Sequence, residues 1–264
     1  MTHFFDRLAA RTRDVGSYLC VGLDPQPDLH TADELADFLI PIVEATAPYA
    51  ACFKPNLAFF EAHGIPGLRS LERVLAAVPR GIPVIGDMKR GDIGSTSKAY
   101  ARAAFDVWGF DAVTVSPYLG FEGIEPFLSY ADRGVYVLCR TSALAGAADL
   151  QSERLASGLR VFEHIAWLVG RRPERMGLVV GATAAGDEVA AVRRLAPAAS
   201  LLVPGVGAQG GDVETVLRAA GALPGSIVFN VSRGILYPEG RPARPPEAAA
   251  AAERLRDRIA AAVR

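Results

Sequence analysis

Lysine is scarce in this chain of 264 residues. Lys and Arg together number 28, yet the only lysines are Lys54, Lys89 and Lys98. The other basic residues are arginines, a bias of composition that has no bearing on the fold. A lysine can release a proton near neutral pH when its site lowers its pKa, whereas an arginine cannot. We therefore treat each lysine as a candidate for proton chemistry.

Cysteine and histidine are also sparse, with three and four copies. Cys20, Cys52 and Cys139 lie inside apolar runs and form no CxxC pair, so neither a zinc site nor a redox motif is indicated. We expect small buried thiols in a reducing compartment. The histidines lie far apart along the chain, which argues against a histidine-based metal site or catalytic triad.

The chain also has little net charge and lacks a long apolar run. Its formal charge is −1, so no basic field attracts nucleic acid or an anionic membrane. No apolar stretch approaches the ~20 residues of a membrane span. Charged residues interrupt the segment from Met1 to Arg13, which is therefore unlike a signal peptide. We expect a cytoplasmic globular protein whose partners include neither nucleic acid nor membrane.

What the chain does have is a regular alternation of short apolar runs and helical patterns. The runs are continuous, as in parallel strands covered by helices. They are Tyr18–Leu23, Ala51–Phe53, Ile82–Gly86, Ala112–Ser116, Val135–Cys139, Leu178–Gly181, Ser200–Val203 and Ile227–Val231. The helical patterns are Ala32–Ala47, Leu68–Ala77, Ser97–Trp108, Ser152–Val169, Asp187–Leu195, Asp212–Ala219 and Pro246–Val263.

Strand–helix alternation predicts βαβ units and a parallel sheet. Eight such units in about 250 residues match an α/β fold of the (β/α)8-barrel (TIM-barrel) type. An open doubly wound sheet is the alternative, but it more often has fewer strands. Because no linker or repeat divides the chain, we predict a single domain over residues 1–264. The irregular segment Ser142–Ala148 is a candidate mobile loop over a site.

Polar residues follow these runs, at the barrel face where such folds place their chemistry. Asp87 and Lys89 are two residues apart, so in an extended strand they point the same way. Asp92 follows them, and Asp24 and Lys54 come from the ends of the first two runs. The array is either a salt-bridge network that closes the barrel or a functional site, and five converging charges favour the site.

A glycine-rich loop follows the seventh run. It contains Gly205, Gly207, Gly210 and Gly211, and Arg233 comes just after the eighth run. In (β/α)8 barrels the loops after strands seven and eight often hold phosphate. Exposed backbone N–H groups and an arginine fork both suit phosphate oxygens. The sequence therefore predicts a phosphorylated small-molecule substrate.

The segment Val84–Thr96 resembles the signature of the orotidine 5′-phosphate decarboxylase family. It follows the pattern D-x-K-x-x-D-[IV]-x-x-T after an apolar strand. Leu23–Pro25, Lys54–Asn56 and Ser232–Gly234 match further elements of that family in the expected order. The length and the Phe-Lys-Pro-Asn form are similar to the longer bacterial subgroup. The family fold is a (β/α)8 barrel, which agrees with the strand count.

The resemblance implies roles for the charged array. Lys89 would donate the proton, with Asp87 and Asp92 beside it and Lys54 completing an Asp-Lys-Asp-Lys set. In the family the second aspartate of the signature enters the partner subunit's site. The resemblance therefore implies a homodimer with shared active sites, in which Asp92, Ile93 and Thr96 complete the neighbouring site.

The resemblance also implies how a nucleotide would be held. Asp24 would bind ribose hydroxyls, and Ser142, or less favourably Thr141, would contact the pyrimidine ring. The 5′-phosphate would lie against the last two loops, whose implied binding residues are Pro204, Gln209, Ser232 and Arg233.

The implied reaction is loss of CO2 from orotidine 5′-phosphate to give uridine 5′-phosphate, the last step of UMP synthesis, without metal or other cofactor. Three alternatives remain at this point. A related barrel could decarboxylate a sugar phosphate with Mg2+ held by the same carboxylates. An aldolase could form a Schiff base on Lys54 or Lys89. A nucleotide-binding barrel could have lost its activity, although such a protein has no reason to retain these charges.

Overall fold

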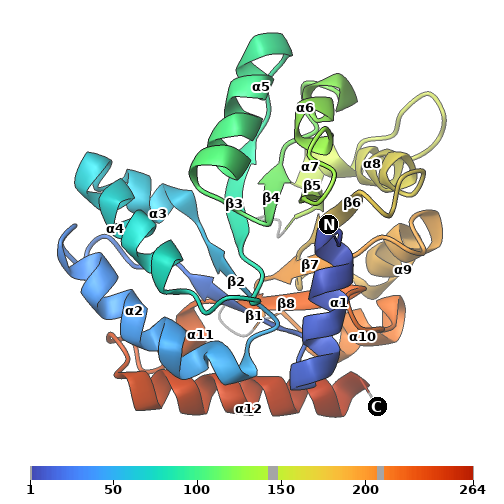
Figure 1. Cartoon of the computed structure of the whole chain (residues 1–264). Coiled ribbons are helices and arrows are strands. Elements are labelled where there is room, and N and C mark those ends of the chain that lie inside the picture. The colour runs from blue at the N-terminus through green and yellow to red at the C-terminus, as the bar shows by residue number, and fades with distance from the viewer. Residues whose placement is uncertain (1, 142–147, 207–210, 264) are drawn as a thin grey trace.

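A ring of eight parallel strands forms the centre of the molecule (Figure 1). The computed structural model describes residues 2–141, 148–206 and 211–263. The strand order is β2-β1-β8-β7-β6-β5-β4-β3, and isolated bridges from Phe53 to Val84 and from Asn56 to Asp87 join β2 to β3. The chain is therefore the (β/α)8 barrel that the sequence predicts.

Each of the eight apolar runs forms a strand, with bounds that differ from the predicted ones by a few residues. The strands are β1 (Leu19–Leu23), β2 (Cys52–Pro55), β3 (Ile85–Arg90), β4 (Ala112–Val115), β5 (Gly134–Arg140), β6 (Met176–Val180), β7 (Leu201–Pro204) and β8 (Ile227–Val231). Most of these residues are buried on both faces, which explains why the runs are continuous rather than alternating.

Helices cover the outside of the ring (Figure 1). The longer ones are α1 (Phe4–Val15), α2 (Glu34–Thr46), α4 (Gly64–Ala77), α5 (Gly94–Arg102), α8 (Val161–Val169), α9 (Gly186–Leu195), α10 (Val213–Ala220) and α12 (Pro245–Val263). The shorter ones are α3 (Leu57–Glu61), α6 (Glu125–Leu128), α7 (Ala148–Ser152) and α11 (Arg233–Leu236), with single turns η1 (Ala47–Tyr49), η2 (Ala103–Val107) and η3 (Phe121–Gly123). None of the helices in the described parts of the chain is both long and apolar enough to cross a membrane.

The structure corrects one predicted helix. The pattern predicts a single helix over Ser152–Val169, but the helix there begins only at Val161. Gly158 adopts a φ of 83°, which a right-handed helix does not allow. The Arg160 backbone N–H donates to Glu163 Oε2 at 2.8 Å, and this bond marks the start of α8. The preceding segment Ser142–Ala148 lies, except for Ala148, outside the described residues.

The interior of the ring is closed at one end by α1, which the sequence pattern does not predict. Phe4 and Leu8 of α1 are fully buried among inward-facing residues of the strands, such as Cys20, Ile85 and Tyr136. A second, larger apolar layer lies between the strands and the outer helices. Because α1 fills the N-terminal end of the barrel, the open end is the one at which the strands terminate.

Candidate active site

A cavity of about 620 Å3 opens at the carboxyl ends of the strands. This volume lies within the range of about 300–1,000 Å3 that is typical of small-molecule sites. Every strand, or the residue that follows it, contributes to the lining. The cavity contains seven of the predicted site residues: Asp24, Lys54, Asp87, Lys89, Pro204, Ser232 and Arg233.

Asp87 lies between two lysines in the lining of this cavity. Its Oδ2 accepts a hydrogen bond from Lys54 Nζ at 2.8 Å, and its Oδ1 accepts one from Lys89 Nζ at 2.6 Å. The two lysines differ in their surroundings: Lys54 is 2% exposed, whereas the side chain of Lys89 is 48% exposed. Lys54 is therefore a fixed structural charge, and Lys89 is the ammonium group that a ligand in the cavity can reach.

Electrostatics keeps the buried pair ionised. Burial alone would lower the pKa of Lys54, but Asp87 and Asp24 more than offset this, and the pKa lies above its ordinary value. Burial alone would raise the pKa of Asp87, but Lys54 and Lys89 hold it well below the usual range. The Lys54–Asp87 pair consequently keeps its charges across the neutral pH range.

Asp87 and Lys89 meet for a different reason from the predicted one. Strand β3 is not regularly extended, because its pairing with β4 shifts between Gly86 and Arg90. Lys89 has a φ of 49° and is the one non-glycine residue in the described ranges with a positive φ. This left-handed conformation costs about 1–2 kcal/mol for an L-residue. A strained backbone at a cavity is a common property of functional sites.

Two polar side chains of the cavity lie next to each other. The buried atoms Asp24 Oδ1 and Ser232 Oγ meet the full geometry of a hydrogen bond with no group in the described part of the chain, although Ser232 is close enough to lower the pKa of the Asp24 carboxyl. Burial raises the pKa of the Asp24 carboxyl, which Lys54 opposes. Strands β1 and β8 approach closely here: a Cβ on Gly22 would lie 2.8 Å from Ser232 Cβ. Asp24 and Ser232 both line the cavity, and carboxylate and hydroxyl groups of this kind suit the hydroxyl groups of a ligand.

The part of the cavity after β7 and β8 can accept an anion. Pro204 ends β7, and Gly205 follows it with a φ of 93°, a conformation that favours glycine. Arg233 is the first residue of α11 and is exposed at the mouth of the cavity. An exposed arginine beside a glycine turn suits a phosphate group.

The sequence profile described as "Orotidine 5′-phosphate decarboxylase / HUMPS family" matches residues 17–252, which include every strand of the barrel. The chain belongs to this family. Within the match lie the charge array, Asp24, Ser232 and Arg233.

Individual relatives agree with this assignment. The chain is 46% identical to orotidine 5′-phosphate decarboxylase of Roseiflexus sp. (strain RS-1), and the alignment covers 98% of each chain. It is also 46% identical to the enzyme of the same name from Paracidovorax citrulli (strain AAC00-1), again over 98% of each. The structure of Leishmania donovani OMP decarboxylase superposes with a TM-score of 0.87 at 40% identity and covers 99% of both chains.

Part of the family signature lies outside the cavity. Asp92, Ile93 and Thr96 follow β3 and do not line the cavity of their own chain. Asp92 is half-buried and its Oδ1 accepts the Ile93 backbone N–H at 2.8 Å. Ile93 and Thr96 are exposed. The predicted residues Ser142 and Gln209 lie outside the described residues.

The lining also includes residues that sequence reasoning did not single out as site residues. Among them, Thr114 is 1% exposed and Asn230 is 7% exposed. Thr114 lies in the middle of an apolar run, where a threonine is indistinguishable from an ordinary strand residue. Asn230 is easier to recognise in the sequence as a site residue, because a buried amide near a strand end requires polar partners. One such partner is the Cys20 thiol, whose Sγ lies 3.5 Å from Asn230 Oδ1.

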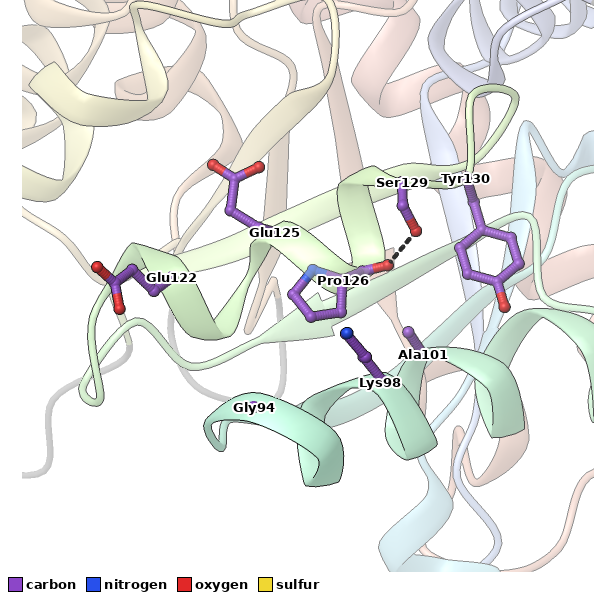
Figure 2. Close-up of a pocket in the computed structure, with 8 residues that line it drawn as sticks. All are labelled: Gly94, Lys98, Ala101, Glu122, Glu125, Pro126, Ser129 and Tyr130. Carbon is purple, nitrogen blue, oxygen red and sulfur yellow. Dashed lines mark hydrogen bonds between the residues drawn. The ribbon is translucent and has the colours of Figure 1, made fainter.

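The third lysine lies in a different place. Lys98, on α5, faces a second hollow of about 590 Å3 between α5 and α6, which Figure 2 shows in close-up. Glu122, Glu125 and Tyr130 also line this hollow, which shares no residue with the cavity at the strand ends. No group of three or more His, Cys, Asp or Glu in residues 2–141, 148–206 and 211–263 is arranged to hold a metal ion.

Proposed function

We propose that the chain decarboxylates orotidine 5′-phosphate to uridine 5′-phosphate and CO2, the last step of UMP synthesis. The observation that carries the proposal is the Lys54–Asp87–Lys89 array, with a half-exposed ammonium facing a cavity of nucleotide size. The names of the similar proteins support the same reaction.

The proposed step places Lys89 beside C6 of the pyrimidine ring. The bond from C6 to the carboxylate carbon breaks, and its electron pair stays on C6 in the plane of the ring, where it cannot delocalise. A fixed cation next to C6 stabilises this charge in the transition state. Lys89 Nζ then gives a proton to C6, and water returns a proton to the amine.

Asp87 has two roles in this proposal. Its contact with Lys89 Nζ at 2.6 Å holds the ammonium in place. Its own negative charge lies next to the substrate carboxylate and disfavours the bound substrate relative to the transition state. In that transition state the carboxylate becomes neutral CO2 and the negative charge moves to C6, beside Lys89. Lys54 keeps Asp87 ionised, since the two form a buried pair at 2.8 Å. Asp92 would complete the charge set from the partner subunit.

Nucleotide binding is proposed to use the remaining groups. The Asp24 carboxylate lines the cavity and suits a ribose hydroxyl, and Ser232 lies beside it after the end of β8. Arg233 would bind the 5′-phosphate, with Pro204 nearby and Gln209 as a further ligand. Ser142, or failing it Thr141, would contact the pyrimidine. Phosphate binding away from C6 can supply the free energy that aligns the array.

The test is an absorbance assay of orotidine 5′-phosphate with purified protein in EDTA. We expect full turnover, because the proposed step uses only Lys89 and its neighbours. Turnover that EDTA abolishes and Mg2+ restores would instead support a metal-dependent decarboxylase. Borohydride trapping of substrate on Lys54 or Lys89 would support a Schiff-base enzyme, and nucleotide binding without turnover would support an inactive barrel.

We also propose a homodimer with shared sites. Ile93 is 62% exposed, and Tyr118 and Leu119 in the loop after β4 are exposed as well. Large apolar side chains left exposed in this way are typical of interaction surfaces. The test mixes inactive Lys89→Ala and Asp92→Ala proteins. Partial activity is expected, since some hybrid dimers contain one intact site, and no recovery after demonstrated subunit exchange would contradict shared sites.

A cytoplasmic location is proposed as well. It is supported by the three cysteines, which are all free and buried, as suits a reducing compartment. Cell fractionation with an antibody to the chain tests it, and recovery mainly from a membrane or secreted fraction would contradict it.

A further inference from the structure

Strand β3 carries a bulge next to the charge array. Gly86 pairs with Val113 of β4, and the next pair is Arg90 with Val115. Three residues, Asp87, Met88 and Lys89, therefore lie opposite Thr114 alone. A bulge of this kind interrupts the ladder and leaves backbone N–H groups without their usual acceptors.

The hydroxyl group of Thr114 takes the place of those acceptors. It accepts the backbone N–H of Met88 at 3.1 Å and that of Lys89 at 3.0 Å. It donates its own proton to Asp87 Oδ1 at 2.8 Å. A hydroxyl has one proton and two lone pairs, so all of its capacity is used. Because both lone pairs are engaged, its proton is directed at Asp87.

These contacts hold Lys89 at both ends. The Thr114 hydroxyl binds the Lys89 amide, where the backbone has its positive φ of 49°. The Asp87 oxygen that receives the Thr114 proton is the same Oδ1 that accepts from Lys89 Nζ at 2.6 Å. Thr114 itself is 1% exposed, so water does not compete for the bonds of its hydroxyl group.

We propose that Thr114 is a positioning residue for the reacting lysine: its hydroxyl group fixes the left-handed backbone of Lys89 and orients the Asp87 carboxylate that holds Nζ. The inference rests on the proposed decarboxylation, in which Nζ must lie beside C6. Small displacements of a reacting group reduce rates strongly, which is why such a hydroxyl matters.

The test is Thr114→Val, which keeps the branched shape and removes the hydroxyl. We expect kcat to fall about 10- to 100-fold, the range that corresponds to losing a hydrogen bond to a charged group. Binding of UMP should stay close to wild type, because Lys89 acts on the transition state rather than on the bound nucleotide. Thr114→Ser keeps a hydroxyl and should restore most of kcat. If Thr114→Val does not fold, Thr114→Cys replaces it with the same expectation, since a thiol is a weak donor.

Thr46→Val is the matched control. Thr46 is fully buried at the end of α2, and its hydroxyl donates to the Ile42 carbonyl at 2.7 Å, away from the cavity. This variant should lose stability with kcat unchanged. The proposal is overturned if Thr114→Val keeps the wild-type kcat, if Thr114→Ser is as impaired as Thr114→Val, or if UMP binding weakens in proportion to kcat.

Crystal structures of wild type and Thr114→Val separate this inference from the proposed reaction. We expect the variant to lose the positive φ at Lys89 or the contact between Nζ and Asp87. An unchanged array would overturn the positioning role whatever the activity. If wild type does not decarboxylate orotidine 5′-phosphate, the proposed function fails, and this comparison still decides what Thr114 holds in place.

Discussion

The Lys54–Asp87 pair should be an energetic unit of the fold. The two charges lie 2.8 Å apart, with 3% and 10% of their side chains exposed. At an effective dielectric constant of about 20 their attraction is about 6 kcal/mol, part of which offsets the cost of burying them. We therefore expect Lys54→Met and Asp87→Asn each to lower the free energy of unfolding by about 3–5 kcal/mol, because each leaves a buried charge without its partner.

A double-mutant cycle tests this. The double variant should lose less than the two single variants combined, with a coupling of about 2–3 kcal/mol, measured by guanidinium unfolding at pH 7. Lys89→Met is the matched control: the contact of Lys89 with Asp87 has a half-exposed ammonium and is screened, so this substitution should cost less than about 1 kcal/mol. Additive losses, or a Lys89→Met cost equal to that of Lys54→Met, would refute the account of the buried pair.

The same pair predicts how stability depends on pH. The pKa of Asp87 is lower in the folded protein than in the unfolded chain. Its contribution is therefore present above the ordinary carboxyl pKa of about 4 and is lost as the pH falls toward the folded value. Wild type should lose stability on acidification below about pH 5 more steeply than Asp87→Asn. Parallel pH profiles for the two proteins would contradict this.

Three further substitutions are informative. Asp24→Asn should raise the Tm of the unliganded protein at neutral pH and weaken UMP binding. The pKa of Asp24 is raised in the folded protein, so ionising its carboxyl group above that pKa costs stability. A lower Tm would contradict this. Tyr237→Phe should cost about 1–3 kcal/mol in urea unfolding, since its hydroxyl accepts the Gln26 backbone N–H at 2.8 Å; a neutral result would show that this bond is dispensable. Arg233→Ala should raise KM about 10- to 100-fold, because contacts with the phosphate are lost. Its Tm should stay unchanged, because the Arg233 side chain is exposed. An unchanged KM would place the phosphate elsewhere.

The barrel could be predicted from the sequence because each buried strand is a continuous apolar run. The polar residues after Leu23, Phe53 and Gly86 could then be placed at one end, since parallel strands share their direction. Seven predicted residues line one cavity for this reason. The helix α1 escaped prediction because nothing in its own pattern indicates that Phe4 and Leu8 close the barrel rather than cover its outside.

The geometry of β3 could not be predicted in the same way. An extended strand would place Asp87 and Lys89 side by side, and no local signal marks a lysine with a positive φ. Its cause is a hydroxyl group on the neighbouring strand, Thr114, which is distant in sequence. The helix predicted from Ser152 fails for a similar reason, because Gly158 and the Arg160–Glu163 contact decide where α8 begins.

The central claim is that the Lys89 ammonium gives its proton to C6. The most direct measurement is the turnover of orotidine 5′-phosphate by Lys89→Ala and Lys89→Arg beside wild type, with UMP binding measured on the same proteins. The account predicts that both variants lose turnover and that Lys89→Ala still binds UMP, because arginine supplies a charge but does not readily release a proton. Turnover by either variant at a rate comparable to wild type would contradict it.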